Sequence, residues 1–129
     1  MTFSVDDAMA LAHQVRRWLA ENGIRIRCPH RARPLIQAVL LRHGIHVEQT
    51  RASGRIGFLV PACGLLIEVE DPAASGAEIW RPITRAADCP QVNAILLVTN
   101  SQHGRPASAG PGKPVLCARP VARKRRYAA

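Results

Sequence analysis

Two periods of hydrophobic and polar residues run along this chain, and each predicts a different kind of element. From residue 5 to residue 22, apolar side chains recur every three or four positions, which is the spacing of an amphipathic helix. Ser4 is placed to cap this helix, Asp6 and Asp7 lie in its first turn, and Gly23 is placed to end it. The predicted buried stripe consists of Val5, Ala8, Met9, Ala12, Val15, Trp18 and Leu19.

A second helix is predicted to begin at Pro34, in the first helical turn, and to end before Gly44. The residues before it, Arg25–Arg33, contain four arginines and show no regular period. We interpret them as a basic loop or a short strand that is a candidate for phosphate contacts. After Gly44, apolar and polar residues alternate up to Glu48, which predicts a short first strand.

The stretch from Gly54 to Asp71 is the strongest β signal in the chain. Two apolar runs, Arg55–Val60 and Gly64–Val69, are separated by a short turn-like break and predict a β-hairpin. The second run ends with Glu68 and Glu70, one strand period apart, so both should point to the same face, about 7 Å from each other. Two carboxylates this close at the end of a buried strand repel each other, and a divalent metal, a basic partner or open solvent would reduce that repulsion.

The rest of the pattern completes a mixed α/β (α+β) fold with a central sheet flanked by helices. Residues 75–78 read Ser-Gly-Ala-Glu and resemble a capping box that opens a third helix, which Pro82 should shorten or kink. Residues 94–99 form an apolar run that predicts a central strand buried on both faces. Residues 100–114 predict a loop, and residues 115–118 a short final strand.

Composition indicates one globular, basic domain. The chain has 129 residues, 47% of them hydrophobic, which suffices for one hydrophobic core. Its 18 basic and 9 acidic residues give a net charge of +9, which favours phosphate backbones or acidic protein surfaces as partners. The predicted domain covers residues 1–120, and a basic tail follows at residues 121–129. The basic side chains of that tail are Arg123, Lys124, Arg125 and Arg126.

Cysteine usage and hydropathy predict a soluble, cytoplasmic protein. The four cysteines are widely spread and form no CxxC pair, so we interpret them as small core residues in a reducing compartment. The N-terminus carries Asp6 and Asp7 where a signal peptide needs positive charge. Because no apolar run approaches the ~20 residues of a membrane span, no membrane partner is expected.

The order of these elements, together with the runs G-R-I-G-F-L-V and I-E-V-E, resembles small phage-type members of the PD-(D/E)XK nuclease superfamily. In that family the second strand ends in a metal-binding Asp, and the third carries Glu-x-Lys. The matching positions here are Gly57, Glu68 and Glu70, and Glu48 resembles an acid often found upstream. The resemblance implies a restriction-endonuclease-like αβββαβ core over residues 34–120, preceded by the helix and basic loop of residues 1–33.

The helix that follows in this family often reads R-Q-L-x-R-Y, whereas this chain has Pro82 at the Gln and Ala86 at the Tyr. With Gly57 and Glu70, four functional positions therefore depart from the family pattern. The resemblance implies a non-catalytic protein of phage or mobile-element type that needs no cofactor and binds DNA or RNA. It also implies that the cytoplasm is that of a bacterial host cell. The predicted contacts to nucleic acid are Arg55, Arg81, Arg85 and the four basic residues of the tail.

Two alternatives stay open at this point. The same scaffold would serve as a phage-encoded inhibitor that binds a protein complex of a bacterial defence system. An active nuclease would instead hold Mg²⁺ or Mn²⁺ on Glu48, Glu68 and Glu70, because carboxylates are the ligands that these ions prefer. The oligomeric state is also open, a homodimer included.

Overall fold

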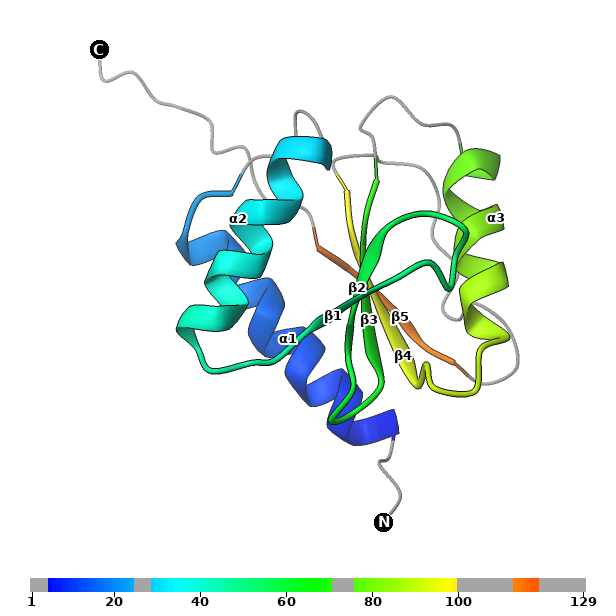
Figure 1. The fold of residues 1–129 in the computed structure, drawn as a ribbon, viewed down its shortest axis with the longest axis horizontal. Coiled ribbons are helices and arrows are strands. Elements are labelled where there is room, and N and C mark those ends of the chain that lie inside the picture. Colours follow the sequence, from blue (N-terminus) through cyan, green and yellow to red (C-terminus); the bar gives the residue numbers. More distant parts are fainter. Residues whose placement is uncertain (1–4, 25–28, 71–75, 100–112, 119–129) are drawn as a thin grey trace.

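The computed structural model describes residues 5–24, 29–70, 76–99 and 113–118. In this part of the chain, three helices pack on a five-stranded sheet (Figure 1). The predicted α/β class, a mixed sheet flanked by helices, is confirmed. The elements in chain order are α1 (Val5–Glu21), α2 (Pro29–Arg42), β1 (Glu48–Thr50), β2 (Gly57–Val60), β3 (Leu65–Val69), α3 (Gly76–Ala87), β4 (Ala94–Val98) and β5 (Val115–Ala118).

The sheet is half antiparallel and half parallel, with the strands in sequence order from β1 to β5. Strands β1, β2 and β3 form an antiparallel meander in which Phe58 pairs with Ile67, so the predicted hairpin is confirmed. Strands β4 and β5 then run parallel to β3, with Ile67 beside Leu96 and Leu96 beside Leu116. The carboxyl ends of β3, β4 and β5 therefore lie at one edge of the sheet, the edge at which α/β sheets commonly bind ligands.

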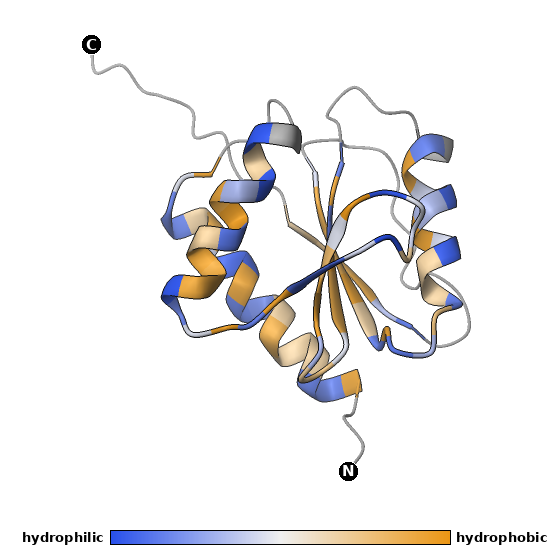
Figure 2. Cartoon of the chain, viewed as in Figure 1, coloured by the Kyte–Doolittle hydropathy of each residue, from blue (hydrophilic) through white to orange (hydrophobic). Residues whose placement is uncertain are grey.

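Helices cover both faces of the sheet, α1 and α2 on one and α3 on the other (Figure 1). Because side chains alternate along each strand, β3 sends Ile67 and Val69 into the core under α1 and α2, and Leu66 into the core under α3. The five residues of β4 are all buried, which agrees with the central strand predicted from the sequence. Figure 2 shows the strands as the main hydrophobic stretch of the molecule.

Helix α1 follows its predicted bounds closely, and most of its predicted stripe is buried. Ala8, Ala12, Val15 and Leu19 contact the core, with Met9 and Trp18 packed at its margin. Val5 is an exception, because the first residue of the helix extends past the sheet and its side chain is 38% exposed. The ring of Trp18 stacks on His43, with 3.7 Å between centroids, which gives that histidine a packing role.

The prediction for the start of the second helix was wrong. Helix α2 begins at Pro29 rather than Pro34, so the end of the predicted basic loop is helical. Pro29 takes the first helical position, where a missing N–H costs nothing, and Ala32 in the next turn is buried in the core. The first strand also begins later than predicted, at Glu48, because pairing with β2 defines it.

Proline in the third helix shortens it less than the sequence suggests. Pro82 lies inside α3, yet the helix continues to Ala87 and buries Ile79, Ile83 and Ala86 against the sheet. Burial of this stripe offsets the hydrogen bond that Pro82 removes. The predicted cap at Ser75 and most of the predicted loop 100–114 lie outside the described residues. None of the described helices is both long and apolar enough to cross a bilayer.

Candidate functional site

The candidate site lies at the carboxyl edge of the parallel strands, on the face that α3 covers. Glu68 on β3 and Glu70 directly after it point to this face, together with Gly57 at the start of β2. Both glutamates are fully buried, with 0% exposure. The structure therefore brings together the three positions that the resemblance picks out, and it places them between the sheet and the start of α3.

Gly57 leaves space that the side chain of Glu68 fills. A Cβ atom at position 57 would lie 2.3 Å from Glu68 Oε2 and 3.1 Å from the backbone oxygen of Ile67. The first distance is shorter than any van der Waals contact, so a larger residue at position 57 would require Glu68 to move. The orientation of the Glu68 side chain therefore depends on the absence of a side chain at position 57.

Ser53, in the loop between β1 and β2, holds Glu68 in that orientation. The Ser53 hydroxyl donates to Glu68 Oε2 at 2.9 Å and accepts from the backbone N–H of Arg55 at 3.3 Å. Glu68 Oε1 is buried and accepts no hydrogen bond from the described residues. Burial, opposed by the Ser53 hydrogen bond and assisted by the charge of Glu70, raises the pKa of Glu68 from 4.5 to about 7.

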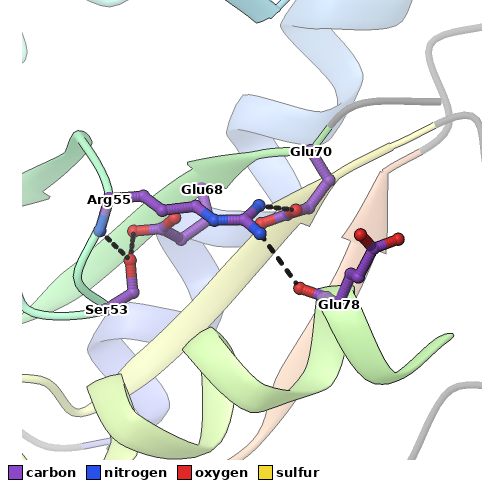
Figure 3. Close-up of polar contacts among 5 residues, drawn as sticks. All are labelled: Ser53, Arg55, Glu68, Glu70 and Glu78. Carbon is purple, nitrogen blue, oxygen red and sulfur yellow. Dashed lines mark hydrogen bonds and ion pairs between the residues drawn. The ribbon is translucent and has the colours of Figure 1, made fainter. Parts of the chain in front are cut away.

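Arg55 from the same loop reaches across the site to Glu70 (Figure 3). Its Nη1 donates to Glu70 Oε1 at 2.5 Å, and its Nη2 donates to the backbone oxygen of Glu78 in the first turn of α3 at 3.2 Å. The guanidinium thereby joins the β1–β2 loop, the end of β3 and the start of α3. In this ion pair the Arg55 side chain is 39% exposed to solvent, whereas the Glu70 side chain is fully buried.

A second arginine acts on the site from the other layer of helices. Arg33, in the first turns of α2, is half-buried, and its positive charge lowers the pKa of Glu68, as does that of Arg55. The sequence pattern places Arg33 at the end of a basic loop or short strand. In the structure Arg33 is helical, because α2 begins five residues earlier than predicted.

Glu48 does not join this site. It lies on β1 with its side chain 58% exposed, and its carboxylate is 3.8 Å from the ring of His46. The described residues contain no group of three or more His, Cys, Asp and Glu side chains that could hold a metal ion. Glu68 and Glu70 already face Ser53 and Arg55, and Gly57 supplies no ligand, so these residues do not fit a divalent metal centre.

The other residues predicted to contact nucleic acid are distributed over several places. Arg81 and Arg85 are exposed on α3, one turn apart, and the Arg85 guanidinium lies against Gly54 of the β1–β2 loop. Arg55 pairs with Glu70 and donates to the backbone oxygen of Glu78, and its side chain is partly exposed. The four basic residues of the tail lie outside the described residues. Described residues include 10 of the 18 basic and 8 of the 9 acidic side chains, so most of the excess positive charge belongs to other segments.

Sequence reasoning missed Ser53 and the carbonyl group of Glu78. Neither carries a motif, because a serine in a turn is common and a backbone oxygen is present at every residue. The pair of acids at the end of a buried strand indicates only that hydrogen-bond donors must lie nearby in the fold. The path of the β1–β2 loop determines that these donors are Ser53 and Arg55.

This geometry defines a mixed α/β protein with a buried acid cluster at the carboxyl edge of its parallel strands. A scan against protein-family models and searches of curated proteins and of solved structures give no match to the chain.

Replacing Gly57 by Ala should destabilise the protein, although Ala in place of Gly usually favours a strand. The added Cβ collides with Glu68 Oε2, so the carboxylate must leave Ser53, and we expect the free energy of unfolding to fall by about 2 kcal/mol. Urea unfolding of Gly57→Ala measures this loss. In a Glu68→Ala background the same change should cost much less, because only the 3.1 Å contact with the Ile67 backbone oxygen remains. Equal losses in both backgrounds would show that the contact with Glu68 is not responsible.

Proposed function

We propose that this chain is a non-catalytic relative of the PD-(D/E)XK nucleases that binds nucleic acid. One observation carries the proposal: Gly57 and Glu70, at positions that hold Asp and Lys in the family, lie on the same face beside Glu68. The positive charge at this site comes from Arg55 and is neutralised by Glu70. An arrangement of this kind stabilises the fold and leaves the acids poorly suited to hold a metal.

The distribution of positive charge supports nucleic acid as the partner. Because β3, β4 and β5 are parallel, the chain leaves Ala118 at the same edge of the sheet as the acid cluster. The sequence after Ala118 contains five of the 18 basic residues. On the α3 side, Arg81 and Arg85 add two exposed guanidinium groups one helical turn apart.

Binding should show the salt dependence that phosphate contacts produce. We expect fluorescence polarisation with labelled single-stranded and double-stranded DNA and RNA to give an affinity that falls linearly with salt on logarithmic axes. Replacing Arg81 and Arg85 by Ala should make that slope shallower by about 2, roughly one for each lost phosphate contact. The matched control replaces Arg16 and Arg17 of α1, which are also exposed but belong to the opposite helical layer.

Two outcomes would contradict the proposal. Absence of salt-sensitive binding to all four nucleic acids would remove nucleic acid as the partner. Cleavage of plasmid or single-stranded DNA with Mg²⁺ or Mn²⁺ that is lost in Glu68→Ala would instead establish an active nuclease, with Glu68 as a metal ligand. The exposure of the Glu48 side chain, away from the buried Glu68 and Glu70, argues against that function.

A second candidate function is inhibition of a bacterial defence complex by protein binding. It is favoured by the small net charge of the described residues and by the internal use of Arg55, both of which reduce the phosphate-binding surface of the core. A pull-down from bacterial lysate tests it. A stoichiometric protein partner that survives nuclease treatment would support this function, whereas loss of all partners after that treatment would favour nucleic acid.

A further inference from the structure

The outward face of α2 differs in composition from the rest of the described surface. Helix α2 contains no acidic residue, and two of its leucines are among the three large hydrophobic side chains exposed in the described part of the chain. Leu35 is 52% exposed and Leu41 is 61% exposed. From residue 31 to residue 42, the exposed positions are Arg31, Pro34, Leu35, Ala38, Leu41 and Arg42. We call these six residues the α2 outer face.

The spacing of these residues makes them one continuous surface. They recur every three or four positions, while Ile36, Val39 and Leu40 on the other side of the helix are buried in the core. The two arginines stand at the ends of the apolar stretch, about 16 Å apart along the helix axis. Arg42 contacts the turn after α1, where its Nη1 donates to Asn22 Oδ1 at 3.2 Å.

We propose that the α2 outer face docks an amphipathic helix of another protein, one with an apolar stripe and a carboxylate at each end of it. Exposed apolar patches rimmed by charge commonly mark protein interfaces. A helix laid along α2 would cover Leu35, Ala38 and Leu41, and its terminal carboxylates would meet Arg31 and Arg42. This interaction is separate from nucleic-acid binding, which involves α3 and the acid-cluster edge.

Two other occupants of the α2 outer face do not match it: the undescribed segments of this chain and a second copy of the chain. The segments of this chain outside the described residues contain one acidic residue, Asp71, in the stretch Asp-Pro-Ala-Ala-Ser, which has no large apolar side chain to cover the leucines. A second copy of the chain that paired through α2 would bring arginine against arginine in either helix orientation, and such like-charge contacts disfavour association.

The test uses a designed helical peptide of about 18 residues with leucines on one face. Two glutamates flank the leucines on that face, about 16 Å apart to match the spacing of Arg31 and Arg42. Fluorescence anisotropy with the full chain should show binding about tenfold tighter than for a matched peptide with lysines in place of the glutamates. Leu35→Ser and Leu41→Ser should each weaken binding about tenfold. Val5→Ser, at the third exposed large hydrophobic, is the matched control and should leave binding unchanged.

Reversing the charges gives the sharpest outcome. The double variant Arg31→Glu, Arg42→Glu should prefer the lysine peptide, and its binding to nucleic acid should change much less than that of the Arg81, Arg85 variant. The proposal is overturned if the glutamate peptide does not bind below about 1 mM or if the two peptides bind equally. It is also overturned if Leu35→Ser abolishes self-association instead, or if anionic phosphatidylglycerol vesicles bind this face more tightly than the peptide does. Thermal unfolding confirms that each variant is folded.

Discussion

Replacing Arg55 by Ala should lower the free energy of unfolding by about 3 kcal/mol. Glu70 is fully buried, and the change removes the guanidinium that faces its carboxylate. The carboxyl group of Glu68 lies close enough for its charge and that of Glu70 to repel each other. The backbone oxygen of Glu78 loses a donor at the same time. Urea unfolding followed by circular dichroism measures the loss, and the slope of the transition shows whether the native state stays compact.

A double-mutant cycle with Glu70→Gln separates the ion pair from the packing of the Arg55 side chain. If the pair is responsible, Arg55→Ala should cost much less in the Glu70→Gln background, because the buried side chain at position 70 then carries no charge. Arg81→Ala serves as the matched control, since that arginine is exposed on α3 and its loss should change stability by less than about 0.5 kcal/mol. Equal costs for the two arginines would show that the Arg55–Glu70 pair contributes nothing to stability.

Replacing Glu68 by Gln should stabilise the protein at pH 8 and remove a pH dependence at the same time. The pKa of Glu68 is raised to about 7 in the folded state, chiefly by burial, against 4.5 for an exposed side chain. The folded state therefore holds the proton more tightly, so wild-type stability should fall as pH rises from about 4.5 to about 7. This loss amounts to about 3 kcal/mol and is complete above pH 7 or so.

Glutamine keeps the shape of the side chain and an oxygen for the Ser53 hydroxyl, but carries no charge at any pH. Unfolding free energies measured from pH 5 to pH 8 should thus converge at low pH and separate at high pH, with Glu68→Gln the more stable. Glu48→Gln is the matched control, because that acid is exposed on β1 and should leave the wild-type profile unchanged. Parallel profiles for wild type and Glu68→Gln would mean that Glu68 is ionised in both states.

The two variants also bear on function, because they change the acid cluster without touching Arg81, Arg85 or the tail. If the cluster has a purely structural role, Glu68→Gln should bind nucleic acid as the wild type does. The cation next to the acids comes from Arg55 on the β1–β2 loop. An internally neutralised cluster of this kind holds the β1–β2 loop against the start of α3.

Much of the sheet was predictable from local patterns. The apolar runs of β2 and β3 with a short break between them predict the hairpin, and the period of two places Glu68 and Glu70 on one face. The apolar run of β4 predicts its burial on both faces. The start of α2 was not predictable, because Pro29 and Pro34 are both acceptable in a first helical turn and burial of Ala32 favours the earlier one.

The sequence by itself determined the class of fold, the position of the two buried acids and the excess of positive charge, because each depends on composition or on a short period along the chain. Only the tertiary structure decided what neutralises those acids. Ser53 and Arg55 are 15 residues from their partners in sequence and reach them through the β1–β2 loop, whose path is set by strand pairing. The structure also decided which helix face stays uncovered, since that follows from how α1 and α2 pack together on the sheet.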